Sequence, residues 1–425
     1  MKTFLKSVNL NVKYNLDTLE TPIIVYFKVT GCCNLNCSFC SQSDSKRINM
    51  DFEEAKKLLR EFKKMGVISI NYTGGEPLTY PYILELLKYG YSLGFEQTLI
   101  TNGIDLFKNE AILNYVNTVG ISLHGNPEIH DKLCGVPGVF KVLKDNIDKI
   151  ILKYPQINLN INCTLTKDNI DFDNLAFIVK FAKKRNIKLS FGRLNYLGAA
   201  SNDQIIDPDL YLKNIDELSK KYQYISISNC ISACSCNARY RYLCHSCGAG
   251  ISLFSIEPNG DVKICPSSNY VLGNAFKKNF SQISSSQYLK TYKKFDWLPN
   301  LCRLCKDFER CKGGCHAEGN FLFFDNSCDA LLISILKKTW QNIKHKKLIL
   351  KCGKIRREKQ DFLIIKVPLR KVDKNGYKIL LDCDGNKTGG ELEAKFDRIE
   401  NIRDFLCTLY IDGIIGEAVY EKKEN

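Results

Sequence analysis

Hydrophobic and polar positions alternate in long blocks through the first two hundred residues of the chain. The apolar run Ile23–Val29 predicts a strand buried on both faces. After a polar loop, Asp51 precedes an apolar stripe at helical spacing, with Glu54 placed as in a capping box and Gly66 at the end. We therefore expect a strand, a loop and an amphipathic helix in this order.

The same pattern then repeats. It predicts further strands near residues 67–72, 97–101, 118–123, 157–165 and 187–192, with helical stretches between them. Six strands separated by helices indicate a parallel sheet with right-handed crossovers. A polar signature follows each strand: in order Cys33, Cys37 and Cys40; Glu76; Asn102; Ser122 and His124; Thr164; and Arg193. Barrels of this kind carry their active sites at the carboxyl ends of the strands, so we expect the site there.

Length and composition indicate a globular protein of two or three domains. The chain has 425 residues, and no apolar run reaches the roughly 18 residues of a transmembrane helix. The N-terminus lacks the apolar core of a signal peptide, so we expect a cytoplasmic protein. In that reducing compartment the 20 cysteines favour metal ligation over disulfides.

The first cysteine group has the spacing Cys33-x3-Cys37-x2-Cys40. Three thiolates on one loop hold three irons of a 4Fe–4S cube and leave the fourth iron open to a small molecule. A zinc site would normally need a fourth Cys or His nearby. Cys32 is adjacent, but side chains of neighbouring residues diverge, so we leave it out as a ligand.

This segment resembles the radical S-adenosylmethionine (SAM) superfamily. Phe39 stands in the aromatic position before the last cluster cysteine, residues 74–77 match the GGEP motif, and residues 101–103 and 122–125 look like the ribose-side signatures. The resemblance covers residues 22 to about 200 and implies a partial (β/α)6 TIM-like barrel. It implies SAM as cofactor, an electron donor such as flavodoxin or ferredoxin, and a 5′-deoxyadenosyl radical that removes hydrogen from substrate.

By the same resemblance eight residues are candidate SAM contacts: Phe39, Gly74, Gly75, Glu76, Asn102, Ser122, His124 and Arg193. The chain departs from the family in two places. Cys134 replaces the arginine of an HDxxR stretch, and His124 stands where many relatives have aspartate. Arg193 is therefore only a candidate for the SAM carboxylate, and no catalytic residue is assigned beyond the cluster.

A second cysteine group resembles the SPASM domain, which carries auxiliary iron–sulfur clusters in peptide-modifying relatives. It comprises Cys247, Gly260-x4-Cys265, Cys302-x2-Cys305-x5-Cys311-x3-Cys315 and Cys328. The alternative is a zinc ribbon-like structural site. The resemblance implies two auxiliary 4Fe–4S clusters, one on Cys302, Cys305, Cys311 and Cys328 and one on Cys247, Cys265 and Cys315. Cys244 is a tentative fourth ligand of the latter; Cys230, Cys234 and Cys236 compete for that place or are buried thiols. An incomplete set would leave an iron for a substrate thiolate.

The C-terminal part begins with a concentration of positive charge. The net charge is +15, and residues 337–359 contain ten basic residues against the single acid Glu358. This stretch suits an acidic partner or is a solvated linker. Beyond it, residues 361–370 predict an edge strand, and residues 379–381 and 392–396 predict short helices. Residues 374–380, 384–388 and 409–415 resemble the PqqD-like fold, a winged helix that captures a leader peptide as an added strand. The alternative is a generic winged-helix or packing domain.

We therefore expect four parts: a radical SAM barrel (1–225), an irregular SPASM domain (226–335), a basic linker (336–354) and a small winged-helix-like PqqD-like domain (355–425). The expected function is modification of a ribosomally made precursor peptide with a leader sequence, with a thioether or carbon–carbon crosslink as product. We expect neither a membrane nor a nucleic acid as partner.

Several alternatives remain. A tetrapyrrole or haem-pathway radical SAM enzyme would not need residues 355–420. In sulfatase-maturing enzymes an aspartate follows the second SPASM cysteine, whereas Pro266 follows Cys265 here. Outside enzymes, an iron–sulfur protein that binds nucleic acid or transfers electrons is the alternative.

Overall fold

The computed structural model describes two compact units, which are considered separately below. The larger contains the described residues from 21 to 295 and residues 311–315; the smaller contains those from 338 to 418, with residues 307–310. The described residues are 19, 21–43, 46–194, 199–200, 202–222, 225–228, 230–233, 236–268, 270–295, 307–315, 338–351, 355–358, 361–364, 370–372, 374–399, 402–411 and 413–418. Among them, no helix is long and apolar enough to cross a membrane.

The larger unit is built on one sheet with the strand order β10-β9-β8-β1-β2-β3-β4-β5-β6-β7. The strands from β8 to β7 in this order are parallel, and β9 and β10 pair antiparallel. The six strands that the sequence predicts are present as β1 Ile24–Thr30, β2 Ser69–Gly74, β3 Glu96–Thr101, β4 Thr118–Ser122, β5 Asn158–Leu165 and β6 Lys188–Arg193. The short strand β7, Ile225–Ile227, extends the sheet beyond β6.

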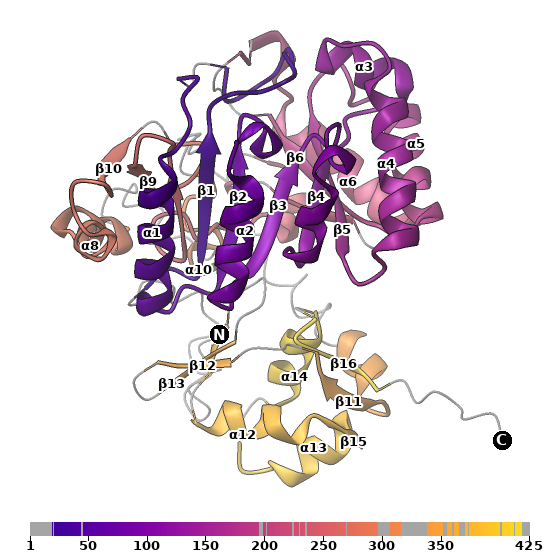
Figure 1. Ribbon diagram of the computed structural model, residues 1–425. Coiled ribbons are helices and arrows are strands. Elements are labelled where there is room, and N and C mark those ends of the chain that lie inside the picture. Colours follow the sequence, from indigo (N-terminus) through magenta and orange to yellow (C-terminus); the bar gives the residue numbers. More distant parts are fainter. Residues whose placement is uncertain are drawn as a thin grey trace. The chain divides into compact units, whose positions relative to one another are not determined.

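Helices connect these strands and cover the outside of the sheet (Figure 1). They are α1 Phe52–Met65, α2 Ile83–Ser92, α3 Pro127–Cys134, α4 Val139–Lys153, α5 Phe172–Lys184 and α6 Pro208–Lys221. Helix α1 begins as predicted, because the Asp51 side chain accepts a hydrogen bond from the Glu54 amide at 3.0 Å. It ends at Gly66, whose φ of 83° is the left-handed conformation that glycine adopts readily.

The segment after the barrel joins the same sheet at its other edge. Strand β8, Leu253–Ile256, pairs parallel to β1, and β9, Asp261–Lys263, turns back beside it. Gly260 forms the turn with a φ of +84°, and a Cβ there would lie 2.6 Å from the Phe276 ring. Both the backbone conformation and the lack of space explain why glycine stands at this position of the SPASM pattern. β10 Val271–Asn274, α7 Phe280–Ser284 and α8 Gln287–Lys293 follow, and α7 packs against both α1 and β10. The sheet thus runs through the predicted boundary at residues 225–226.

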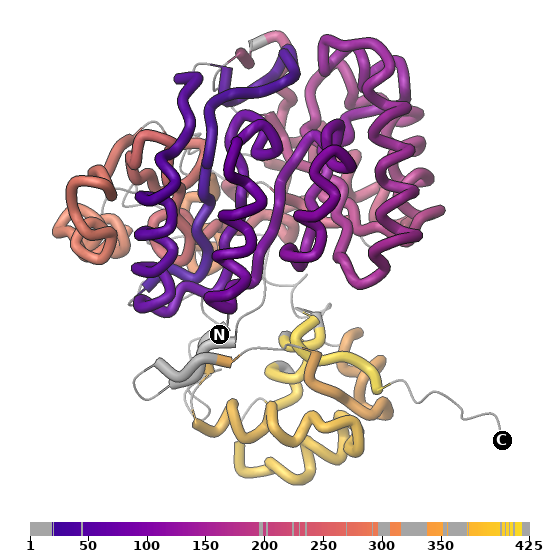
Figure 2. Tube along the Cα trace, in the orientation of Figure 1, coloured from indigo at the N-terminus to yellow at the C-terminus, as the bar shows by residue number. Residues whose placement is uncertain are grey.

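The smaller unit has its own hydrophobic core. Its strands form two antiparallel sheets, with the orders β15-β11-β16 and β12-β13-β14. The elements are β11 Lys347–Leu350, β12 Ile355–Glu358, β13 Asp361–Ile364, β14 Arg370–Val372, α12 Lys374–Asp382, β15 Asp384–Thr388, α13 Gly389–Lys395, α14 Ile402–Ile411 and β16 Ile415–Glu417. Figure 2 traces this part of the chain in orange to yellow. Helices α12 and α13 lie where the sequence predicts them.

One expectation for this region differs from the structure. Residues 336–354, expected as a linker, contain β11, and the buried side chains of Ile343 and Leu348 belong to the core of the smaller unit. The lysines between these apolar positions are partly or fully exposed, and Lys346 pairs with Glu417 at 2.5 Å. The basic residues that suggested a linker thus flank a short apolar strand, in which Leu348 is buried and Lys347 is exposed.

Candidate active site

A cavity of about 340 Å³ lies at the carboxyl ends of the parallel strands. Seven of the eight predicted SAM contacts line it: Phe39, Gly75, Glu76, Asn102, Ser122, His124 and Arg193. Gly74 is the exception. The cluster cysteines Cys33, Cys37 and Cys40 line the same cavity. The structure therefore brings together polar groups from the carboxyl ends of six successive parallel strands and from the loops after them, where the sequence predicts the site.

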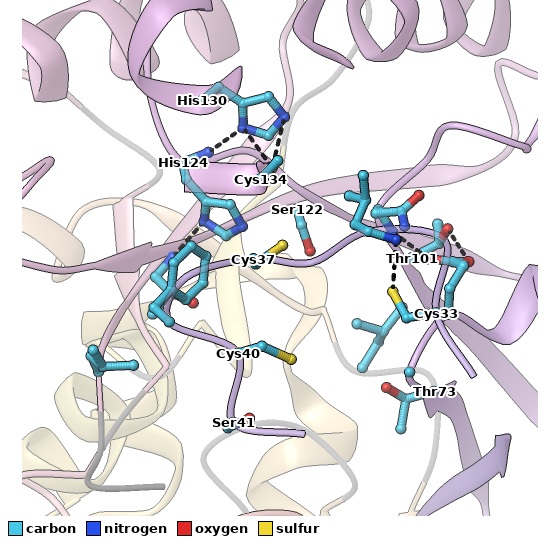
Figure 3. Close-up of a pocket in the computed structure, with 18 of the residues that line it drawn as sticks. Cys33, Cys37, Cys40, Ser41, Thr73, Thr101, Ser122, His124, His130 and Cys134 are labelled. Atoms are coloured by element: carbon cyan, nitrogen blue, oxygen red, sulfur yellow. Dashed lines mark hydrogen bonds between the residues drawn. The ribbon is translucent and has the colours of Figure 1, made fainter. Parts of the chain in front are cut away.

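The cluster loop follows β1 directly, and its three cysteines surround a common space (Figure 3). Backbone amides support two of the sulfurs, because the amide of Leu35 donates to Cys33 Sγ and that of Gln42 donates to Cys40 Sγ, both at 3.4 Å. Burial raises the pKa of the Cys33 thiol to about 11, so this sulfur is protonated near neutral pH when no metal is bound. The thiols fit a 4Fe–4S cube, which would displace these protons.

Two glycines let the loop after β2 approach the cluster loop closely. The amide of Gly75 donates to the Thr30 carbonyl at 2.8 Å, and the amide of Glu76 donates to the Cys32 carbonyl at 2.8 Å. A Cβ on Gly75 would lie 2.2 Å from the Cys32 oxygen, and one on Gly74 would lie 2.2 Å from the Thr30 oxygen. Any side chain at these positions would push the two loops apart.

Glu76 ties this loop to the loop after β3. Its buried carboxylate accepts hydrogen bonds from the Thr101 hydroxyl at 2.7 Å, the Asn102 amide at 2.8 Å and the Leu78 amide at 3.1 Å. Burial raises the pKa of Glu76 to about 7, although these three donors oppose the shift. A carboxylate with three donors retains capacity to accept one more, which suits an ammonium group in the cavity.

The loop after β3 also contacts the cluster loop directly. The Asn102 side-chain amide donates to Asn34 Oδ1 at 2.7 Å, and the Asn34 amide donates to Asp105 Oδ2 at 2.8 Å. Asn34 lies between Cys33 and Cys37, so these bonds hold the cluster loop against β3. Hydrogen bonds from Glu76 and Asn34 thus join three successive loops around one cavity.

A buried pair of histidines forms the wall of the cavity near Phe39. His124 Nδ1 accepts from the Thr164 amide at 3.2 Å, which fixes its ring, and the ring packs edge-on against Phe39 with centroids 4.7 Å apart. The His124 backbone amide in turn donates to His130 Nδ1 at 3.1 Å. Burial lowers the pKa of His124 to about 3 and that of His130 to about 4, so both rings are neutral at physiological pH.

Cys134 is a cavity residue that the sequence marked only as a departure from the family pattern. It is buried at the end of α3, lines the cavity, and lies 3.7 Å from His130 Nε2 (Figure 3). Its thiol forms a hydrogen bond with Cys37 that, together with burial, raises the pKa of the Cys37 thiol. No sequence spacing links Cys134 to the cluster loop, so only the fold reveals this contact.

Other cavity residues stand at the remaining strand ends. Thr101 and Thr164 line the cavity beside their predicted neighbours, and Ser267 reaches it from the segment after β9. Arg193 is buried and donates from Nη1 to the Ile206 carbonyl at 3.1 Å. Its place on the wall fits a contact with the SAM carboxylate, which stays a prediction.

Part of the second cysteine group lies next to this cavity. Cys265 is two residues before Ser267, and burial raises the pKa of its thiol to about 11. The ammonium group of Lys28, on β1, lies next to this segment. It pairs with the Glu257 carboxylate at 2.8 Å and donates to the Pro266 carbonyl at 3.4 Å. Cys302, Cys305, Cys328 and the competing Cys234 lie outside the described residues.

Comparison with known families agrees with this geometry. Residues 27–177 match the radical SAM superfamily, and residues 244–307 match SPASM, an iron–sulfur cluster-binding domain. The chain thus combines a radical SAM domain with a SPASM domain, and its cofactors are 4Fe–4S clusters and SAM.

Several known proteins resemble the chain over most of its length. An AdoMet-dependent heme synthase of Oleidesulfovibrio alaskensis is 25% identical over 333 residues, covering 70% of this chain and 83% of the relative. A PqqA peptide cyclase of Rhizobium meliloti is 24% identical over 333 residues, covering 73% and 87%. In fold, the chain is similar to Streptococcus suis SuiB bound to the precursor peptide SuiA, with a TM-score of 0.58 and 21% identity over 76% of this chain and 78% of that one.

Proposed function

We propose that this protein is a radical SAM enzyme that modifies a ribosomally made precursor peptide, with a thioether or a carbon–carbon crosslink as the product. The observation that carries the proposal is the separate C-terminal unit, which has its own core and two small antiparallel sheets. Among the described strands, β12, β14, β15 and β16 each stand at a sheet edge. An extended leader peptide adds to such an edge through main-chain hydrogen bonds. The similarity to a PqqA peptide cyclase supports the same substrate class.

The cavity residues have distinct parts in this proposal. When bound, the cluster and SAM supply the 5′-deoxyadenosyl radical that removes a hydrogen atom from the substrate. Cys33, Cys37 and Cys40 hold the cluster, and Gly74 and Gly75 let the loop after β2 pack closely against the cluster loop. Glu76 accepts the methionine ammonium, and the neutral His124 and Phe39 shield the cavity from water.

The alternative with direct support is a tetrapyrrole-tailoring enzyme. The heme synthase relative is as similar to the chain as the peptide cyclase, and in both cases the match covers most of the relative's length. A haem precursor would need no leader-binding unit, so the smaller unit distinguishes the two candidates. The sulfatase-maturase alternative has less support, because Pro266 follows Cys265 where those enzymes carry an acidic residue.

Removal of the smaller unit tests the proposal. A chain ending before Lys338 lacks β11 and the core of that unit, whereas a cut before Arg356 would leave β11 unpaired. We expect the shortened enzyme to form 5′-deoxyadenosine without peptide but to lose turnover of a full-length precursor, because tethering at effective concentrations on the order of mM is gone. Anisotropy of a labelled leader measures the binding, and measurement at high salt separates the contribution of the lysines. If the shortened enzyme binds and modifies the precursor as well as the intact one, the peptide proposal fails and the tetrapyrrole alternative gains.

A further inference from the structure

Four cysteines gather beside β1 in the SPASM segment, and one of them lies outside the seven-cysteine pattern. Cys230 is buried and follows β7, while Cys247 precedes β8 and Cys265 follows β9. The thiols of Cys230 and Cys247 form a hydrogen bond with each other. Negative charge on Cys315 and Cys265 also raises the pKa of Cys230, so these two thiols lie within electrostatic range of it. Cys247, Cys265 and Cys315 are the three ligands that the sequence predicts for one auxiliary cluster, and Cys230 is the additional cysteine near them.

Backbone contacts join these segments in two pairs, independently of the thiols. Gly314, directly before Cys315, has a φ of +66°, and a Cβ there would lie 2.3 Å from the Ser232 nitrogen. The backbone of residues 230–233 therefore packs directly against Gly314, the residue before Cys315. On the other side, the Gly250 amide donates to the Ile264 carbonyl at 3.0 Å, which joins the turn after Cys247 to the residue before Cys265.

The same cysteines affect the pKa values of two tyrosines. The pKa of Tyr26, on β1, is raised mainly by burial, and the sulfurs of Cys265, Cys247 and Cys230 add to this effect. Burial likewise raises the pKa of Tyr292, on α8, with Cys247, Cys265 and Cys315 as its sulfur neighbours. The four thiols thus lie within electrostatic range of these two rings, with Cys230 buried and the other three partly exposed.

Cys244, the tentative fourth ligand, has a different sulfur neighbour. Its Sγ lies 3.3 Å from Cys236 Sγ, and both thiols are buried. Cys244 also donates to the Tyr240 carbonyl and Cys236 to the Ala233 carbonyl, so each thiol points back to its own short turn. The structure therefore pairs Cys236 with Cys244 and groups Cys230 with the SPASM ligands.

We propose that Cys230 is the fourth thiolate ligand of the auxiliary cluster held by Cys247, Cys265 and Cys315. Four thiolates complete the ligation of a 4Fe–4S cube, so this cluster has no open iron and does not bind a substrate sulfur. Its place near the cavity, two residues from Ser267, suits transfer of an electron to or from the reacting centre. The inference depends on the SPASM clusters and not on the identity of the substrate.

The test uses full-length protein in which Cys33, Cys37 and Cys40 are replaced by alanine, so that only auxiliary clusters are loaded. In this parent, ¹³C-cyanide should give no hyperfine coupling in the EPR-based spectra of the dithionite-reduced clusters, because no iron is open. Cys230→Ala should either lose about four irons relative to the parent or keep them and gain cyanide coupling. Cys244→Ala and Cys236→Ala should match the parent in both measurements. Neither peptide nor SAM is present, so failure of the peptide proposal would not affect the result.

Three outcomes would overturn the proposal. The first is cyanide coupling in the parent, which shows an open iron and requires no ligand variant to fold. The second is a Cys230→Ala protein that matches the parent in iron content and in its response to cyanide. The third is loss of iron or gain of coupling in Cys244→Ala. If Cys230→Ala does not fold, as judged by circular dichroism, Cys230→Ser replaces it. That protein should retain the cluster with altered g-values from an oxygen ligand, and an unchanged spectrum would again overturn the proposal.

Discussion

The carboxylate of Glu76 and the hydroxyl of Thr101 form a buried hydrogen bond of 2.7 Å between the loops that follow β2 and β3. The same carboxylate accepts from the Asn102 amide, so it fixes two neighbouring loops of the cavity at once. Because burial raises the pKa of Glu76 to about 7, each donor matters for keeping the side chain ionised. The hydrogen bonds that hold the two loops in place therefore also stabilise the negative charge of Glu76 in the cavity.

Thr101→Val should weaken SAM binding and shift its pH dependence upward. The valine is nearly isosteric but removes a donor to the carboxylate, and a hydrogen bond to a charged group contributes about 1.5–3 kcal/mol. We expect SAM affinity to fall roughly tenfold. In the wild type, affinity should decrease as the pH falls through about 7, where Glu76 takes up a proton. In the variant this decrease should begin at higher pH.

Calorimetric titration of the reconstituted enzyme with SAM at several pH values measures both effects. Thr73→Val is a matched control, since Thr73 also lines the cavity at the end of β2. A Thr101→Val enzyme with the affinity and pH profile of the wild type would show that Glu76 does not bind the ammonium.

Replacing Cys33, Cys37 and Cys40 together by alanine should abolish reductive formation of 5′-deoxyadenosine while the fold persists. The three side chains lie on a loop beside the cavity and none is fully buried, although Cys37 packs against a small apolar cluster around Phe39, so their loss costs little packing. Iron content should fall by about four, because only one cluster is removed. Chromatography of the reaction products and iron analysis provide the measurements.

The matched control for this triple variant is Cys163→Ala. Cys163 is a buried thiol on β5 and does not line the cavity, so this variant should keep its iron and its 5′-deoxyadenosine formation. Formation of 5′-deoxyadenosine by the triple variant above a no-enzyme control would remove the assignment of the SAM-binding cluster.

Gly75→Ala should disrupt the cavity more than a glycine substitution elsewhere in the same unit. The new Cβ would lie 2.2 Å from the Cys32 carbonyl oxygen, a backbone atom that can move only with the cluster loop. Gly138→Ala is the control: its φ of +81° strains an alanine by about 1 kcal/mol, but apart from its two chain neighbours none of the described residues has an atom within 4 Å of the new Cβ. We expect Gly75→Ala to lose SAM binding and Gly138→Ala to retain it. Equal SAM affinity in the two variants would contradict the close approach of these loops.

The sequence predicted the elements of the parallel sheet and its helices well, because most of these strands and helices have a regular apolar period. It also predicted most of the cavity, since the motif residues follow their strands directly. It could not show that β8 pairs with β1 or that residues 336–354 contribute β11, because pairing partners far apart in the sequence leave no local pattern.

Sequence spacing likewise predicts contacts between cysteines only when they lie on the same loop. Spacing identified Cys33, Cys37 and Cys40, which share one loop, but it left the fourth ligand beside Cys247, Cys265 and Cys315 open, with Cys244 as the tentative choice. The fold brings Cys230 to Cys247 from the end of β7 and brings Cys134 to Cys37 from the end of α3. Contacts of this kind depend on where strands and helices end in space.

The buried histidines should make the barrel lose stability in mild acid. In the folded chain, the pKa of His124 is lowered from 6.5 to about 3 and that of His130 from 6.5 to about 4, in both cases mainly by burial. Below pH 6.5 the unfolded chain takes up protons that the folded chain does not. The free energy of unfolding should therefore fall with decreasing pH, by up to about 1.4 kcal/mol per pH unit for each histidine, until the folded rings are protonated.

His124→Asn should reduce this slope, and its Oδ1 can still accept from the Thr164 amide in place of Nδ1. Hydrogen-exchange protection of the β4 amides between about pH 7 and pH 5 measures the slope, with His245→Asn as a control for the loss of one imidazole. A slope in His124→Asn as steep as that of the wild type would show that the His124 ring is not held neutral by the fold.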